Sequence, residues 1–402
     1  MTKSDIGVIG MGVMGSNLAL NLVEHGVSTS IYNRSYEKTE ATYEKAKNII
    51  SNDAMQAFKT LEDFVDSLAF PRKVIIIITS GEATDAMINA LIPLLSKGDI
   101  ILEASNAYYK DTLRRMEVLK AVGIHNLGVG VSGGEEGARN GASIMVGGDA
   151  QVYALVEPFL AKAAAESVFG KCVARVGDKA SGHFVKMIHN GIEYAIMEFI
   201  AEIYMLFVEV YKFSAGEISE IFDKYNNTKL KSYLMEISSI VTKTKNPDNP
   251  KEFLIDNVLD IAGAKGTGKW TIQESVAYDY PCPTIAAAVY MRNISGWKKL
   301  RLEYNKLPPT PKEFIKHVEE SLYGAVLVAH LEGLMLMKHI SEKLNFNVDF
   351  LNVLKVWANG CILRKTSIEF STVLLIELEV AGVELTVPLA EFFESSCIPV
   401  EF

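Results

Sequence analysis

Cysteine is scarce in this sequence, and its four copies form no recognisable pair. They are Cys172, Cys282, Cys361 and Cys397, and no CxxC motif joins any two of them. This spacing excludes a disulfide framework and a cysteine-based zinc site, and it is typical of reduced thiols in a cytoplasmic protein. A strand-like segment already begins at Asp5, so we also expect no secretory leader.

An excess of positive charge is missing as well. The chain has 40 Lys and Arg against 49 Asp and Glu, a net charge of -9. We therefore expect no general affinity for nucleic acid or for an anionic membrane, although a local basic pocket remains open. The apolar stretch Leu322–Met337 is interrupted by His330 and Glu332, which favours a buried helix over a membrane span.

The first 178 residues alternate short β-rich segments with segments of helical composition. Strands are expected at Ile6–Ile9, Thr29–Tyr32, Val74–Ile78, Ile100–Leu102, Leu127–Val131 and Ser143–Val146. Helices are expected at Asn17–Glu24, Ala54–Ser67, Lys110–Ala121 and Gln151–Ala164. This alternation predicts an α/β domain over residues 1–178, with a mostly parallel sheet covered by helices on both faces.

The remainder, residues 179–402, reads as an all-α helical domain in which strand signals are scarce. Long helical patterns are expected over residues 182–213, 215–225, 230–242 and 321–343. Pro308, Pro309 and Pro311 predict a surface loop between them.

A glycine-rich turn follows the first strand. Its residues are Gly10, Met11, Gly12, Val13, Met14 and Gly15. In a strand–turn–helix context, GxGxxG is typical of a Rossmann domain, where glycine allows a tight turn and close approach to pyrophosphate. We interpret it as a dinucleotide site in preference to a plain glycine turn.

The end of the second strand bears on which dinucleotide binds. NAD sites usually place a carboxylate there, whereas this chain has Asn33, Arg34 and Ser35. A guanidinium and a hydroxyl suit a 2′-phosphate, so the sequence favours NADP, with Arg34 as a plain solvated residue the alternative.

The first long helical segment carries a polar stripe. At helical spacing, Lys186, His189, Asn190, Glu193 and Tyr194 share one face. An acid and a base close together are what proton transfer requires, but a polar stripe can also be a solvated face. From the residues alone, the two interpretations are about equally supported.

Two further glycine-rich segments are candidate ligand loops. Residues 130–139 follow a strand, and Ser132, Gly133 and Gly134 there could hold a carboxylate or hydroxyls, or form an ordinary flexible loop. Residues 264–271 lack the spacing of a Walker loop, so we reject an ATPase and retain an anion site with Lys265 and Thr267.

Together these segments resemble the 6-phosphogluconate dehydrogenase family. The similarity rests on GMGVMG, NRS, GVSGGEEGAR, HFVKMIHNGIEY and KGTGKWT in the family's order, with weaker similarity through Trp357–Arg364. The resemblance implies a homodimeric, cytoplasmic, NADP-dependent enzyme that decarboxylates a small phosphorylated sugar acid without a metal. Its fold would be an α/β Rossmann domain followed by an all-α helical domain.

The resemblance also implies a role for each matching residue. Lys186 would be the general base and then acid, and burial near cations is expected to lower its pKa; Glu193 would be the second acid. The sugar acid would be held by Asn106, Ser132, Gly133, Gly134, His189 and Asn190, and its phosphate by Tyr194, Lys265, Thr267 and Arg292. Asn106 would also lie beside the cofactor, whose 2′-phosphate Asn33, Arg34 and Ser35 would hold.

The sequence departs from the family pattern in several places. Ala104 and Ser105 replace glycines before Asn106, and Thr79 replaces a lysine expected near the cofactor. The family's C-terminal tail, which supplies an Arg and a His for the phosphate, is expected to be missing, as is a helical stretch after Arg364. Two alternatives therefore stay open: a catalytically impaired homologue that still binds NADP, and a β-hydroxyacid dehydrogenase with an unphosphorylated substrate.

Overall fold

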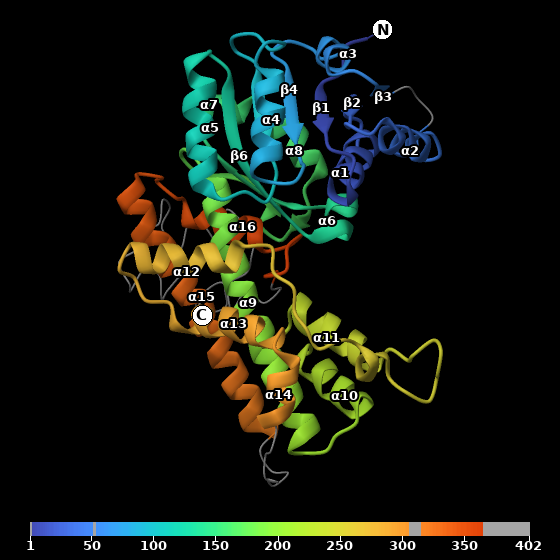
Figure 1. The fold of residues 1–402 in the computed structure, drawn as a ribbon, viewed down its shortest axis with the longest axis vertical. Helices are drawn as coiled ribbons and strands as arrows, with labels where there is room; N and C mark the ends of the chain where they lie inside the picture. The colour runs from blue at the N-terminus through green and yellow to red at the C-terminus, as the bar shows by residue number, and fades with distance from the viewer. Residues whose placement is uncertain (1, 51–53, 305–314, 365–402) are drawn as a thin grey trace. The chain divides into compact units, whose positions relative to one another are not determined.

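The computed structural model describes residues 2–50, 54–304 and 315–364 (Figure 1). These residues divide into two compact units. Unit 1 runs to Lys186 and regains Ser341–Cys361, whereas unit 2 contains residues 187–340 and 362–364. Helices α9 (Ser181–Glu209) and α15 (Ile315–Leu344) each contribute residues to both units.

Unit 1 is built on an eight-stranded sheet with the order β10-β7-β6-β5-β4-β1-β2-β3. Neighbouring strands are parallel except β6 and β7, which pair antiparallel, so the predicted mostly parallel sheet is confirmed. The strands are β1 (Ile6–Ile9), β2 (Thr29–Tyr32), β3 (Met55–Phe58), β4 (Lys73–Ile76), β5 (Ile100–Glu103), β6 (His125–Ser132), β7 (Ser143–Gly147) and β10 (Val173–Gly177).

Alternate residues of the central strands enter two separate apolar cores. In β5, Ile100 and Leu102 belong to the core that α1 and α8 cover, whereas Ile101 belongs to the core with Phe64, Ile88 and Leu119. Side chains of a strand point alternately to its two faces, so helices must cover both. The predicted arrangement, a sheet covered by helices on both faces, is therefore confirmed.

The helices of unit 1 follow the strands in the order of a dinucleotide-binding fold. They are α1 (Val13–Glu24), α2 (Tyr36–Lys47), α3 (Leu61–Asp66), α4 (Glu82–Leu91), α5 (Tyr109–Ala121), α6 (Gly134–Asn140), α7 (Ala150–Ala154), α8 (Glu157–Ala163) and α16 (Phe350–Trp357). A short hairpin, β8 (Glu166–Ser167) with β9 (Gly170–Lys171), precedes β10.

Two predicted helices of unit 1 were wrong. Segment Ala54–Ser67 contains β3 and then α3, because Met55–Phe58 pairs with β2 at the sheet edge and Thr60 caps a new helix. Segment Gln151–Ala164 is two helices, since Pro158 stands in the first turn of α8 and cannot continue α7. The predicted loop at residues 130–139 also contains a helix, α6.

Unit 2 consists of helices, and the described residues after Asp178 contain no named strand. Besides α9 and α15 it has α10 (Ala215–Tyr225), α11 (Tyr233–Lys243), the 3-10 turn Leu254–Asn257, α12 (Thr267–Ala277), α13 (Pro283–Ser295) and α14 (Lys298–Tyr304). The predicted all-helical half is therefore confirmed. Pro308, Pro309 and Pro311, and also Cys397, lie outside the described residues.

Helix α15 includes the predicted helix at 321–343. Among the described residues, its segment Val318–Leu344 alone has the length and composition to cross a membrane, and 44% of its apolar window is buried. A core helix meets the same criterion, so this feature is weak evidence for a span. Gly333 of α15 packs against Ile188 and Ile192 of α9 within unit 2.

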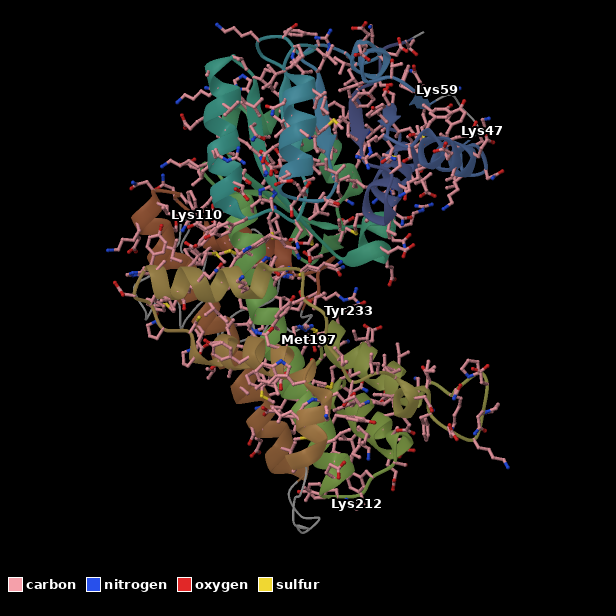
Figure 2. The ribbon with its side chains drawn as sticks, viewed as in Figure 1. Lys47, Lys59, Lys110, Met197, Lys212 and Tyr233 are labelled. Atoms are coloured by element: carbon pink, nitrogen blue, oxygen red, sulfur yellow. The ribbon has the colours of Figure 1, made fainter. Side chains whose placement is uncertain are left out.

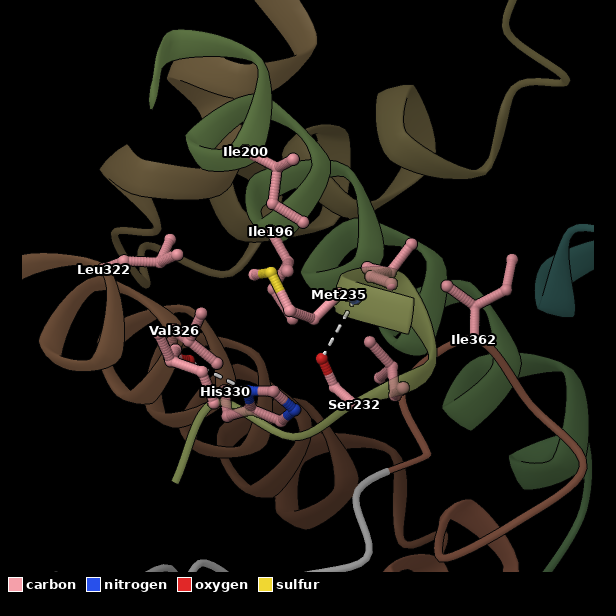
Figure 3. A pocket seen from close by; sticks show the side chains of 11 residues that line it. Ile196, Ile200, Ser232, Met235, Leu322, Val326, His330 and Ile362 are labelled. Atoms are coloured by element: carbon pink, nitrogen blue, oxygen red, sulfur yellow. Dashed lines mark hydrogen bonds between the residues drawn. The ribbon is translucent and has the colours of Figure 1, made fainter. Parts of the chain in front are cut away.

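Unit 2 also has a small apolar pocket of about 20 Å³, shown in Figure 3. His330 and Ser232 are its polar lining residues, and each already has a local partner. The Nδ1 of His330 lies 2.8 Å from the carbonyl of Val326, and Ser232 Oγ accepts the N–H of Met235 at 3.3 Å. The pocket has room for about one water molecule and contains none of the expected site residues.

Candidate active site

The three glycines of the N-terminal turn are required for different reasons. Gly10 has φ +106°, and a side chain on Gly10 or Gly15 would overlap neighbouring backbone oxygens. Gly12, by contrast, has no atom of the described residues within 4 Å of the place a Cβ would occupy. Packing within the chain therefore demands Gly10 and Gly15, whereas Gly12 leaves its backbone open to a ligand.

The turn leads into α1 at an uncapped helix terminus. Gly12 is the N-cap residue and provides no side-chain hydrogen bond, so the N–H groups of the first turn are not capped by that residue's side chain. Such a terminus attracts phosphate through its N–H groups and its dipole. Met11, one residue earlier, is not available in this way, because its N–H donates to Asn33 Oδ1 at 3.0 Å.

The three residues after β2 have unequal surroundings. Asn33 uses both ends of its amide, accepting from Met11 N–H and donating to the Ser35 carbonyl at 3.0 Å. Arg34 and Ser35 are exposed, and Arg34 forms no ion pair within the described residues. Asn33 thus holds the glycine turn, while Arg34 and Ser35 remain available to an anion.

A cation that the sequence interpretation missed lies beside these residues. Phe58 of β3 pairs with Tyr32, which places the next residue, Lys59, at the same sheet edge as Asn33. Its ammonium lies 4.7 Å from the centre of the Tyr36 ring, and Figure 2 labels it. The signal was missed because β3 had been assigned to a helix.

The two side chains that replace the family's glycines before Asn106 are accommodated inside unit 1. Ala104 and Ser105 are buried, and Ser105 Oγ accepts the N–H of Ile78 at 3.3 Å. Asn106 itself is exposed at the end of β5. The two extra side chains therefore pack within unit 1. Thr79 is exposed, and its carbonyl accepts a hydrogen bond from Thr84 Oγ1 at 3.1 Å.

Lys186 lies near the start of α9 and is only 9% exposed. Its Nζ donates to Ser132 Oγ at 2.9 Å, and Ser132 at the end of β6 is itself buried. A Cβ on Gly130 would approach the Lys186 Cβ to 2.6 Å, so β6 and α9 are in direct backbone contact here. The base candidate thus has a fixed position next to the glycine-rich loop.

A buried charged network lies behind β6. Arg115 donates from Nη1 to Glu103 at 2.5 Å and from Nε to Asp85 at 2.7 Å. The hydrogen bond from Arg115 is the main reason that the pKa of Asp85 is lowered. Burial lowers the pKa of His183, whose Nδ1 lies 2.8 Å from Thr112 Oγ1.

The loop after Ser132 is short. Gly133 is the N-cap of α6 with φ +120°, and Gly134 has φ +61°. No atom lies within 4 Å of a Cβ position on Gly134. Gly134, like Gly12, is therefore a glycine that neighbouring side chains do not explain.

In unit 2, α9 brings three of the expected residues together. His189 Nδ1 lies 3.0 Å from Asn190 Oδ1 and 3.8 Å from Glu193 Oε2. Asn190 Oδ1 is within hydrogen-bond distance, and because an amide oxygen only accepts, this hydrogen bond requires the tautomer with the proton on Nδ1. His189 is fully buried and Glu193 is 9% exposed, so this is not a solvated helix face.

Helix α12 packs closely on the same stretch of α9. Asn190 Nδ2 donates to Thr267 Oγ1 at 3.1 Å, and Thr271 Oγ1 donates to the Met187 carbonyl at 3.1 Å. A Cβ on Gly191 would lie 2.9 Å from Thr271. The N-terminus of α12 thus lies next to Asn190.

Tyr194 and Arg292 form a second contact in unit 2. The Arg292 guanidinium carbon lies 4.0 Å from the centre of the Tyr194 ring. Gly268 packs against the same ring, at its Cδ2 and Cε2 atoms. Lys265 is exposed one residue before the α12 cap, Gly266. These positions agree with an anion site formed by the start of α12 and the end of α13.

Lys186 and Glu193 are seven residues apart on one helix. Seven residues are almost two turns, so the two side chains share a face with a rise of about 10.5 Å between them. The helix therefore carries a buried amine and a buried carboxyl on one face, and these are an acid and a base of the kind that proton transfer requires.

Comparisons with known proteins show which family the two parts of the chain match. Residues 5–177 match the NAD binding domain of 6-phosphogluconate dehydrogenase, and residues 182–375 match its C-terminal domain. The NADP(+)-dependent, decarboxylating 6-phosphogluconate dehydrogenase of Bacillus subtilis is 40% identical over 90% of this chain and 78% of its own length. The decarboxylating enzyme of Escherichia coli has the same identity and coverage.

Solved structures show the same similarity. Plasmodium falciparum 6-phosphogluconate dehydrogenase, described in its apo form and in complex with NADP+ and with 6-phosphogluconate, superposes with a TM-score of 0.87. It is 36% identical, over 98% of this chain and 86% of that one. A 3-hydroxyisobutyrate dehydrogenase of Mycobacterium tuberculosis, at 17% identity and a TM-score of 0.55, shares the fold alone.

Proposed function

The chain belongs to the 6-phosphogluconate dehydrogenase family, and from this premise we propose that it converts 6-phosphogluconate to ribulose 5-phosphate and carbon dioxide with NADP as oxidant. The observation that carries the proposal is the buried Lys186, with its amine on Ser132 and a buried carboxyl, Glu193, on the same helix face. A merely solvated face would not bury both groups.

The N-terminal turn fits NADP. Gly12 and the first turn of α1 would hold the pyrophosphate, and Arg34 and Ser35 would hold the 2′-phosphate, with Lys59 adding positive charge. No carboxylate ends β2 to repel that phosphate. Bound NADP supplies the hydride acceptor.

Lys186 would act first as a base. A neutral amine at Nζ takes the proton of the substrate's carbon 3 hydroxyl while the carbon loses its hydride, leaving a β-keto acid. Ser132 Oγ keeps the amine in place through its hydrogen bond. Lys186 then returns the proton to the ketone oxygen as the bond to the carboxyl carbon breaks and carbon dioxide leaves.

Glu193 would complete the reaction. The enediol left after decarboxylation needs a proton at carbon 1, and a protonated Glu193 donates it to give the ketose phosphate. His189 Nδ1, 3.8 Å from Glu193 Oε2, is placed to stabilise the negative charge of the Glu193 carboxylate once the proton has left. The reaction needs two proton-transfer groups, and α9 supplies both.

The remaining residues would bind the substrate. Its hydroxyls and carboxylate are assigned to Asn106, Ser132, Gly133, Gly134, His189 and Asn190. Its phosphate is assigned to Tyr194, Lys265, Thr267 and Arg292. The cation of Arg292 on the Tyr194 ring and the N-terminus of α12 support the phosphate assignment, since both favour an anion.

A homodimer in the cytoplasm is part of the proposal. Unit 2 exposes several large apolar side chains on two segments that Asp260 joins by ion pairs of 2.9 Å to Lys298 and Arg301. They are Val258, Leu259, Ile261, Trp297, Leu300 and Leu302. An exposed apolar group of this kind marks a protein interface, and a second copy would cover it. Sedimentation of the purified chain tests the dimer.

The activity test follows NADPH formation and carbon dioxide release from 6-phosphogluconate in parallel. Both signals should rise together, and gluconate should be a far poorer substrate because it lacks the phosphate. Lys186→Ala should abolish turnover and leave NADP binding unchanged, whereas Lys120→Ala, an exposed lysine of α5, should match the parent protein. A folded protein that binds NADP but is silent with 6-phosphogluconate would contradict the proposal.

A further inference from the structure

A turn late in the chain contacts the Ser132 loop within unit 1. We call residues Trp357–Cys361 the Gly360 turn. A Cβ on Gly133 would lie 2.5 Å from the carbonyl oxygen of Gly360 and 2.8 Å from the Cα of Gly137. The backbone of Gly360 thus lies against the residue that follows Ser132, although 227 positions separate Gly133 from Gly360.

The Gly360 turn is also bonded to the strand paired with Ser132. In the antiparallel β6–β7 ladder, Ser132 lies opposite Ser143. Ser143 donates its N–H to the Gly360 carbonyl at 3.1 Å, and its hydroxyl donates to the carbonyl of Val356. The turn therefore holds Ser143 from one side while the ladder joins Ser143 to Ser132 on the other.

The backbone of the turn is itself fixed. Gly360 has φ +73°, and its N–H donates to the Asn359 side chain at 2.8 Å. The Asn359 amide in turn donates to the Glu166 carbonyl at 2.9 Å. A Cβ on Gly360 would lie 2.8 Å from Ala142 C, Ser143 N and Ala165 Cβ, and no side-chain rotation could relieve those contacts.

This packing separates Gly133 from the glycines that face open space. Gly12 and Gly134 have nothing within 4 Å of a Cβ position, as expected where a ligand approaches. Gly133 has no such space, because the Gly360 carbonyl occupies it. Gly133 is therefore restricted to glycine by its φ of +120° and also by the contact with the Gly360 turn.

We propose that the Gly360 turn is a positioning element for the reaction, which sets the place of Ser132 and, through it, of the Lys186 amine. This inference rests on the proposed function. The sequence of contacts is Gly360 to Gly133 and Ser143, both of these to Ser132, and Ser132 Oγ to Lys186 Nζ. Gly360 thus reaches Lys186 through other residues, which makes the Gly360 turn a positioning element and not a catalytic one.

Gly360→Ala with Gly26→Ala as its control tests the proposal. Gly26 has φ +75°, almost the same as Gly360, but no atom within 4 Å of its Cβ position. The two variants therefore share the backbone strain, and only Gly360→Ala adds the collision. We expect Gly360→Ala to raise KM for 6-phosphogluconate and to lower kcat by about tenfold or more each, with NADP affinity within about twofold of the parent.

Two readouts separate positioning from simple loss of stability. If the Lys186 amine is displaced, the acid limb of the kcat pH profile should shift in Gly360→Ala. A smaller folded fraction would instead lower kcat and leave both KM and the position of that acid limb unchanged. Amide hydrogen exchange of residues 133–141 should speed up in Gly360→Ala and stay unchanged in Gly26→Ala. Unchanged KM, pH profile and exchange would overturn the proposal.

A milder variant covers the case in which Gly360→Ala does not fold. Asn359→Ala removes the hydrogen bonds that fix the turn but adds no collision. It should raise KM for 6-phosphogluconate by about threefold and speed exchange in the same loop. If the parent protein has no activity, the proposed function fails, but the exchange experiment still decides whether the turn holds the Ser132 loop.

Discussion

Gly130 and Lys186 are in such close contact that a methyl group on Gly130 would lie 2.6 Å from the Lys186 Cβ and 2.7 Å from the Gly182 carbonyl. Gly147, on β7, faces the same helix, where a Cβ would lie 2.3 Å from the Gly182 nitrogen. The start of α9 thus lies directly on strand backbone, so the sheet determines where the Lys186 side chain begins.

Gly130→Ala should therefore displace Lys186. Because the colliding atoms are a Cβ and a backbone oxygen, the helix or the strand must shift, and overpacking of this kind costs about 1–3 kcal/mol of folding free energy. A displacement of the amine by about 1 Å is expected to lower kcat by about a hundredfold. Steady-state kinetics with both substrates measure this.

Gly137→Ala is the matched control for that experiment. Gly137 lies in α6, and a Cβ there would meet its neighbours at 3.5 Å or more, which is ordinary contact. Its kcat should stay within about twofold of the parent, because alanine is at least as good a helix former as glycine. Equal losses in both variants would mean that Gly130 has no special relation to Lys186.

The parts of the fold with strong local signals could be predicted from the sequence. Helix α10 was predicted with its observed bounds, since Ser214 and Glu217 form a capping box at its start. Segment Ala54–Ser67 was misassigned because Met, Gln and Ala at 55–57 favour helices locally. Only pairing with β2 makes that segment a strand, and pairing is a tertiary property.

In the candidate site, too, features within one helix could be predicted from the sequence, whereas contacts between residues far apart in the sequence could not. The spacing on α9 places Lys186 and Glu193 on one face, which follows from helix geometry alone. The hydrogen bond between Lys186 and Ser132 joins residues 54 positions apart, and the Gly360 turn is more distant still. The sequence also could not show that Asn33 accepts the N–H of Met11 and so holds the glycine turn. Arg34 is then the exposed cation of this segment.

Arg34→Ala should reduce the ratio of NADP affinity to NAD affinity. Loss of a charge-assisted contact to the 2′-phosphate costs about 1.5–3 kcal/mol, or about ten- to a hundredfold in NADP affinity, while NAD has no group there to lose. Titration with both nucleotides measures the ratio. Lys47→Ala, at the far end of α2, serves as the control; an unchanged ratio in Arg34→Ala would place the 2′-phosphate elsewhere.

Glu332→Ala should destabilise unit 2 by about 1–2 kcal/mol of unfolding free energy. The Glu332 carboxylate accepts the N–H groups of Thr284 at 3.1 Å and Ile285 at 3.3 Å, and thereby caps α13 from another helix. Urea unfolding measures the loss. Glu342→Ala, an exposed carboxylate of the same helix, should change stability by less than about 0.5 kcal/mol. Because α13 carries Arg292, KM for 6-phosphogluconate should also rise in Glu332→Ala.

His183 should make stability depend on pH. Burial lowers its pKa from the ordinary value of 6.5; Glu103 opposes that shift and Arg115 adds to it. The folded protein therefore binds fewer protons than the unfolded chain once the pH falls below about 6.5. Stability from this group is complete above that pH and declines as the pH falls toward the folded-state pKa, by at most about 1.4 kcal/mol per pH unit.

The measurement is the free energy of unfolding in urea at about pH 7.5 and about pH 5.5, for the parent and for His183→Gln. Glutamine can keep a hydrogen bond to Thr112 Oγ1, but it does not titrate. All other groups contribute to both proteins, so the difference in slope belongs to His183. The parent should lose more stability on acidification than the variant. Equal losses would show that His183 stays neutral in the unfolded chain as well, or is protonated in both states, and either result would remove it from the acid sensitivity of unit 1.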